Sequence, residues 1–141
     1  MRRFFSTSPN TVKKLFEIQK ITPLALTDSQ IKIGMQKLEL GEWTLRTDGD
    51  RNVIGKNLQF ENFRNAWDFM SLVAVGADMS EHHPEWFNVY NQVNIIFSTH
   101  DCKGVSVKDL LMAKMIEDVL KNPQTQIIDT YDLNADITWA V

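Results

Sequence analysis

Three histidines are the side chains of this chain best suited to acid–base chemistry near neutral pH. His82, His83 and His100 are its only histidines. Imidazole titrates near neutral pH, so one ring can donate and accept a proton within a single catalytic cycle. His82 and His83 follow a predicted helix, and His100 ends a predicted strand. If the strands next to them pair, we expect the three rings to converge.

A carboxylate close to the first histidine supports this chemistry. Asp78 lies four residues before His82, so the two side chains share a helix face if the helix extends that far. A carboxylate in that place would orient the imidazole and keep it cationic, which suits a general acid.

Each of these residues also has a purely structural interpretation, and on spacing alone that interpretation outweighs the catalytic one. Adjacent histidines in a loop are usually solvent-exposed, and a histidine at a strand end is usually a surface residue. Asp109 fits the N-terminal box of a helix without any further function. Trp43 and Trp86, taken singly, are more often core residues than ligand-stacking surfaces.

Metal and thiol chemistry are weaker alternatives. Zinc sites do use three histidines and a water, but neighbouring residues on a loop point apart, so His82 and His83 do not easily share one ion. We therefore predict no metal and no cofactor. Cys102 lies two residues after His100, a spacing that does not indicate a thiolate pair, and we predict an inert buried thiol.

Length, charge and cysteine content restrict the class of protein. A chain of 141 residues with 43% apolar residues predicts one globular domain. The net charge of −3 argues against general affinity for DNA, RNA or anionic membranes, although not against binding a protein that itself binds DNA. The single cysteine fits a reducing compartment. No apolar run approaches membrane-spanning length.

The chain divides into three predicted segments: an arm at 1–26, a domain at 27–122, and an extension of unknown role at 123–141. The arm is basic, serine-containing and poor in acids, with Glu17 as its only carboxylate. This composition is typical of a mitochondrial presequence, and a disordered arm is the alternative. We therefore expect a mitochondrial or cytoplasmic protein, with the nucleus as a further possibility.

The domain pattern predicts an α+β fold. Thr27–Gln30 resembles a capping box that opens a helix ending near Gly41. Strands follow at 43–46 and 54–60 around a turn at 47–50. A helix runs from Asn62 to residues 79–81, strands occupy 86–90 and 92–99, and a last helix runs from Ser106 to 122. This order predicts a four-stranded antiparallel sheet with three helices on one face, and its open edges favour a homo-oligomer.

The three histidines stand in two stretches, EHHPEWFNVYN at 81–91 and STHDCKG at 98–104. These stretches resemble the pterin-4a-carbinolamine dehydratases, a family that includes the dimerisation cofactor of a homeodomain transcription factor. A weaker resemblance runs from about Leu26 to Val119 and covers Trp43. It does not cover the N-terminal arm or the last twenty or so residues.

The resemblance implies a fold, an activity and a set of site residues. The implied fold has four antiparallel strands and three helices, in tetramers built with sheets joined at their edges and helices packed at the centre. The implied catalytic residues are the three histidines together with Asp78, which stands where the family commonly has glutamate. The implied substrate-binding residues are Trp43, Glu81, Trp86 and Asp109. Trp43 would lie at the pocket rim and Asp109 near the third histidine.

The implied substrate is a 4a-hydroxytetrahydropterin, which loses water to give a quinonoid dihydropterin. We assign His82 and His100 to the acid–base pair around the hydroxyl. His83 would hold or deprotonate the ring, Asp78 would tune His82, and Trp43 would cover the ring. The alternative is a homo-oligomeric binding module that serves as a dimerisation cofactor for a transcription factor.

Overall fold

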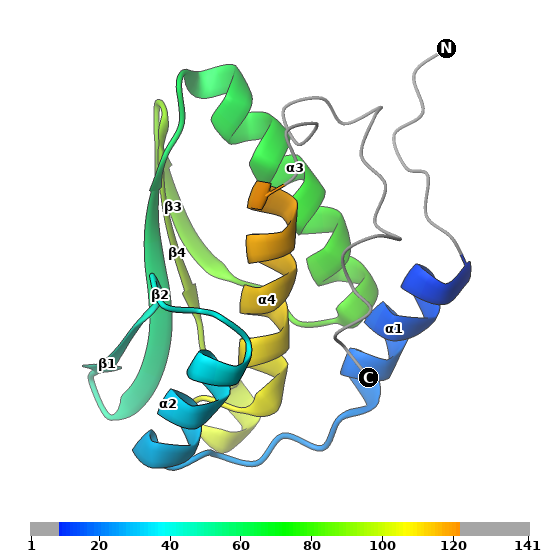
Figure 1. Ribbon diagram of the computed structural model, residues 1–141, viewed down its shortest axis with the longest axis vertical. Coiled ribbons are helices and arrows are strands. Elements are labelled where there is room, and N and C mark those ends of the chain that lie inside the picture. Colours follow the sequence, from blue (N-terminus) through cyan, green and yellow to red (C-terminus); the bar gives the residue numbers. More distant parts are fainter. Residues whose placement is uncertain (1–8, 122–141) are drawn as a thin grey trace.

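The computed structural model describes residues 9–121 of the chain. These residues form a layer of helices packed on one open β-sheet (Figure 1). The helices are α1 (Pro9–Lys20), α2 (Asp28–Lys37), α3 (Phe63–Ser80) and α4 (Val107–Lys121), with a short 3-10 turn η1 (His100–Cys102). The strands are β1 (Thr44–Asp48), β2 (Arg51–Gln59), β3 (Glu85–Val89) and β4 (Gln92–Phe97). Among the described residues, no helix is long and apolar enough to cross a membrane.

The sheet is antiparallel throughout and has the strand order β1-β2-β4-β3. Strand β4 therefore lies between β2 and β3, although it comes last in the chain. In the register, Ile54 of β2 pairs with Phe97 of β4, and Glu85 of β3 pairs with Ile96. The end of β4 thus lies beside the beginnings of β2 and β3. The predicted four-stranded antiparallel sheet is confirmed.

The helices cover a single face of this sheet, as the sequence predicts (Figure 1). Ile54, Val93, Ile95 and Phe97 point into that layer and are fully or almost fully buried. Alternate residues of a strand point to opposite faces, so Asn57 and other polar residues occupy the uncovered face. This part of the core therefore lies between the sheet and helices α2 to α4.

Local sequence signals explain where two of the helices begin. The Thr27 side chain accepts a bond from the Gln30 backbone N–H, and the Gln30 side chain accepts one from the Thr27 N–H, which completes the predicted capping box of α2. Asn62 caps α3 in a similar way by accepting from the Asn65 N–H.

Helix α1 is an addition to the predicted set of three helices. It lies within the segment interpreted as an arm, and it packs on α3 and α4 on the side away from the sheet (Figure 1). Leu15 and Ile18 are buried in the hydrophobic core, and the Lys108 ammonium donates to the Gln19 carbonyl at 3.1 Å. At least part of the predicted arm therefore belongs to the folded domain.

Truncation of the buried face of α1 should destabilise the whole domain. Ile18 is 1% exposed, so Ile18→Ala removes apolar contact and leaves a cavity, at a cost of about 2–5 kcal/mol in the free energy of unfolding. Urea denaturation measures this loss. The matched control is Glu17→Ala on the exposed side of the same helix, where we expect less than about 1 kcal/mol. Equal, small effects of both substitutions would show that α1 is not part of the cooperative unit.

Candidate active site

A sharp reversal of the chain after α3 places the first two histidines. Glu81 adopts a left-handed conformation with φ 49° and ψ 39°, which is uncommon for a residue other than glycine. Its N–H donates to the Asp78 carbonyl, and the His82 N–H donates to the Ala77 carbonyl. These bonds satisfy carbonyl groups at the end of the helix and turn His82 back beneath α3. Pro84 then leads the chain directly into β3.

His100 stands on a short loop that is closed at its base. Thr99 and Gly104 form an isolated antiparallel bridge, with the Thr99 N–H donating to the Gly104 carbonyl at 2.7 Å. The Ser98 hydroxyl donates to the Asn52 carbonyl of β2 at 3.1 Å. These contacts tie the end of β4 to its neighbour, so the position of His100 is fixed relative to the sheet.

The two histidine segments meet because β3 pairs with β4. A cavity of about 640 Å³ opens where β4 ends and where β2 and β3 begin. Its lining residues are Asp50, Arg51, His83, Glu85, Ser98, Thr99, His100 and Lys103. His83 and His100 therefore line one cavity, although sixteen residues of chain lie between them.

His82 lies behind this cavity in a buried hydrogen-bond network. Its Nε2 is 2.7 Å from the Asp109 Oδ1, and its ring stacks on Phe97. The other oxygen of Asp109 accepts from the Thr99 hydroxyl at 2.6 Å and from the Ser106 N–H at 2.8 Å. Asp109 is 0% exposed, so its carboxylate is desolvated but satisfied by three donors. Thr99 both lines the cavity and joins this network.

The carboxylate bonded to His82 is therefore that of Asp109, whereas the sequence predicts Asp78 in that role. Asp78 is exposed on α3. The helix ends at Ser80, so the chain reverses before His82 could share a helical face with it. Of the two hydrogen bonds in the capping box predicted at the start of α4, the structure has the one in which the Asp109 side chain accepts from the Ser106 N–H. The structural and the site roles of Asp109 thus coexist.

The three other predicted substrate contacts lie outside the cavity lining. Trp43 is 4% exposed, and its indole N–H donates to Glu117 Oε1 at 2.8 Å. Trp86 is half-buried against the core, and Glu81 is exposed at the end of α3. Trp43 contacts the ring of Phe97, which in turn stacks on His82. Its connection to the histidines is therefore indirect.

The cavity is also lined by polar side chains that the sequence pattern does not predict as site residues: Asp50, Arg51, Glu85 and Lys103. The predicted strand pairing could have indicated these residues. In an antiparallel sheet the end of one strand lies beside the start of its neighbours. Residues at the beginnings of β2 and β3 were therefore candidates once His100 was placed at the end of β4.

The thiol of Cys102 is partly buried beside the site. Burial, and then the negative charge of Asp109, raise its pKa above the ordinary thiol value. A raised pKa leaves less thiolate at a given pH, and thiolate is the reactive form. The predicted inert thiol agrees with this direction.

We expect Cys102 to react with iodoacetamide more slowly in the folded protein than in the unfolded chain. The rate should also reach half of its maximum at a higher pH in the folded protein, because its thiol pKa is raised. Mass spectrometry of the alkylated chain across a pH series measures both quantities, with guanidinium-unfolded protein as the reference. A folded thiol that titrates at or below the unfolded value would contradict this prediction.

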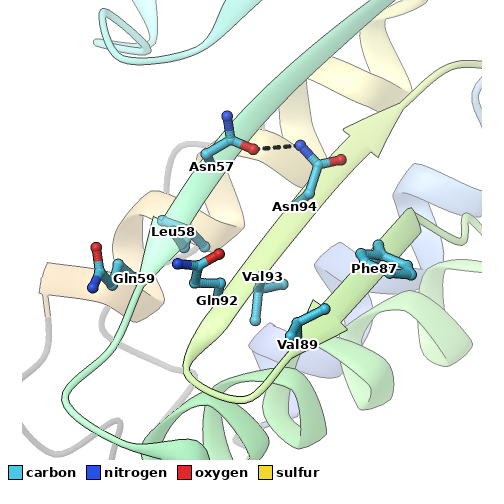
Figure 2. Close-up of a pocket in the computed structure, with 8 residues that line it drawn as sticks. All are labelled: Asn57, Leu58, Gln59, Phe87, Val89, Gln92, Val93 and Asn94. Carbon is cyan, nitrogen blue, oxygen red and sulfur yellow. Dashed lines mark hydrogen bonds between the residues drawn. The ribbon is translucent and has the colours of Figure 1, made fainter.

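A second hollow lies on the uncovered face of the sheet and has a different character. Figure 2 shows its lining residues, with the Asn94 side chain donating to the Asn57 side chain across β4 and β2. The hollow has a volume of about 470 Å³ and is lined by Asn57, Leu58, Gln59, Phe87, Val89, Gln92, Val93 and Asn94. None of these lining side chains titrates near neutral pH, so this hollow supplies no side chain suited to proton transfer there.

Comparisons with known proteins agree on one family. The profile described as "Pterin 4 alpha carbinolamine dehydratase" matches residues 24–119. Two bacterial proteins that carry provisional names as pterin-4-alpha-carbinolamine dehydratases are similar to this chain. The Novosphingobium aromaticivorans protein is 48% identical over 82 residues, 58% of this chain and 83% of that protein. The Burkholderia ambifaria protein is 45% identical over 74 residues, 52% of this chain and 72% of that protein.

One solved structure shows the same architecture. It is the crystal structure of a transcriptional coactivator/pterin dehydratase from Brucella melitensis, with a TM-score of 0.59 and 33% identity. The superposition covers 66% of this chain and 95% of that chain.

Proposed function

The chain belongs to the pterin-4a-carbinolamine dehydratase family, and from that premise we propose that it dehydrates a 4a-hydroxytetrahydropterin to a quinonoid dihydropterin, as in tetrahydrobiopterin recycling. The observation that carries this proposal is the single cavity lined by both His83 and His100, with the bonded His82–Asp109 pair directly behind it. Such a cluster supplies proton donors and acceptors on more than one side of a bound heterocycle.

The reaction needs two proton transfers and no change of oxidation state. The bond between C4a and the hydroxyl oxygen breaks, and the oxygen leaves as water after an acid protonates it. A base removes the proton from the ring nitrogen next to C4a, and the electron pair released there forms the carbon–nitrogen double bond. General acid–base groups of this kind each contribute roughly 10²–10⁴-fold to the rate.

We assign roles to the histidines from their placement. His83 and His100 line the cavity, so in this proposal they contact the bound ring. The Nε2 of His82 is bonded to Asp109, which leaves Nδ1 as the nitrogen that exchanges a proton. Asp109 replaces Asp78 as the residue that orients His82. We do not retain Trp43 as a cover for the ring, because it is buried in the core.

The proposal is tested by dehydration of freshly prepared carbinolamine in a stopped-flow instrument, with and without a chelator. We expect acceleration over the uncatalysed reaction and no effect of the chelator. Among residues 9–121, no three histidine, cysteine or carboxylate side chains are grouped so that they could hold a metal ion. Activity that the chelator abolishes would replace the acid–base proposal with a metal-dependent one.

A second function is a binding module that acts as a dimerisation cofactor. It is favoured by the Brucella melitensis protein, whose name includes transcriptional coactivator. The exposed Phe87, Val89 and Tyr90 on and beside edge strand β3 support a homo-oligomer, a dimer or tetramer, as the working form. Light scattering after size-exclusion chromatography tests this. A monomer at micromolar concentration would reject the oligomer, and absence of dehydration would favour the scaffold over the enzyme.

We also propose a mitochondrial or cytoplasmic address, with the nucleus as a further compartment, on the basis of the basic N-terminal composition. Because α1 begins at Pro9 and is packed on the domain, any cleavage that spares the fold falls before α1. Imaging of residues 1–26 fused to a reporter tests import, and a diffuse cytosolic signal would exclude it for that segment.

A further inference from the structure

Arg51 and Glu85, at the beginnings of β2 and β3, form an ion pair in the lining of the histidine cavity. Arg51 Nη1 lies 2.8 Å from Glu85 Oε2, and Nη2 lies 3.0 Å from Glu85 Oε1. Two parallel bonds between a guanidinium and a carboxylate fix orientation as well as distance. Nη2 also donates to Asp48 Oδ2 at 3.0 Å, so the guanidinium is anchored to the first hairpin. Both residues of the pair line the cavity.

The pair connects two strands that are not neighbours. Arg51 begins β2 and Glu85 begins β3, while β4 lies between them. The strand that the pair spans is the one that leads to His100. Glu85 also follows His83 by only two residues, with the rigid Pro84 between them. Displacement of Glu85 would therefore be transmitted directly to the backbone of His83.

We propose that Arg51 and Glu85 are positioning residues that hold His83 at the working distance from His100. This inference rests on the proposed dehydratase function. Exposed ion pairs contribute little to folding stability, about 0–1 kcal/mol, and Arg51 and Glu85 keep 24% and 55% of their side-chain surface exposed. We therefore expect the pair to affect the position of His83 more than the stability of the fold. A misplacement of a catalytic group by roughly 1 Å can lower the rate by about 10²-fold.

The test is a double-mutant cycle on the full chain with Arg51→Gln, Glu85→Gln and both together. We expect each single substitution to lower kcat by about tenfold or more, with KM changed much less. The double variant should be no slower than the slower single variant, because either change removes the same contact. Arg51→Lys keeps the positive charge but cannot form two parallel bonds to the Glu85 carboxylate, so it should recover only part of the rate. Thermal unfolding checks that every variant stays folded.

Arg46→Gln is the matched control, since Arg46 is an exposed arginine on β1 outside the cavity lining. It should leave kcat unchanged. Additive losses in the cycle, or losses no larger than that of the control, would overturn the proposal.

A second measurement separates this inference from the activity itself. The ring resonances of His83 in NMR spectra should move in both Arg51→Gln and Glu85→Gln, and should stay in place in Arg46→Gln. This readout does not require turnover. Inactive wild-type protein would reject the dehydratase proposal alone, whereas unchanged His83 resonances in both variants would reject the positioning role.

Discussion

His100→Ala should lower the rate of carbinolamine dehydration by at least about tenfold while the protein remains folded. His82→Ala should lower the rate by a similar factor, and because His82 is bonded to the buried Asp109, it should also lower the free energy of unfolding. His100 lies exposed on its loop and lines the cavity, so its loss removes a proton-transfer group without opening the core. Stopped-flow kinetics at saturating substrate measures the change in kcat.

The control for this pair of substitutions is Lys103→Ala, which removes an exposed side chain from the same loop and the same cavity. Lys103 carries no imidazole and has no role in the proposed proton transfers, so we expect a smaller loss of kcat. Full activity in His100→Ala or His82→Ala would remove that histidine from the proposed mechanism.

Asp109→Asn is expected to lower kcat by at least about tenfold, and Asp109→Ala to destabilise the fold as well. The carboxylate accepts bonds from His82, Thr99 and the Ser106 N–H. An amide of the same shape presents an NH₂ group to one of these donors, so it no longer holds His82 in a single tautomer. Alanine leaves all three partners without their acceptor, at a cost of about 3–5 kcal/mol.

Asp78→Asn is the matched control, because Asp78 is the exposed carboxylate that the sequence placed beside His82. It should change neither kcat nor the free energy of unfolding by a measurable amount. If Asp78→Asn lowered kcat as much as Asp109→Asn, the assignment of Asp109 as the residue that orients His82 would be wrong. Urea denaturation and stopped-flow kinetics on the same preparations give both quantities.

The fold was predictable because each element carries a local signal. The period of two in 92–97 and the period near 3.6 in 63–77 follow from which face is buried. The capping box at Thr27 marked the start of α2. Helix α1 was not predicted as part of the fold, because its composition also suits a presequence. Only its packing distinguishes a helix of the domain from a presequence. Leu15 and Ile18 enter the core from that helix.

The histidines of the candidate site could be proposed from the sequence, but their partners could not. A titratable side chain is visible in sequence, whereas the carboxylate that meets it depends on how the chain turns. The left-handed residue Glu81 directs His82 away from Asp78, and α4 brings Asp109 to it from 27 residues further along the chain. Arg51 was missed for a related reason, since its contact with Glu85 depends on β4 lying between their strands.

An NMR titration with a stable pterin that cannot be dehydrated tests most directly whether imidazoles from two segments share one ligand site. The ring resonances of His83 and His100 are followed as the pterin is added, without reliance on turnover. Both rings should shift along the same saturation curve, because both line one cavity. Shifts at only one of the two rings, or at neither, would contradict the account.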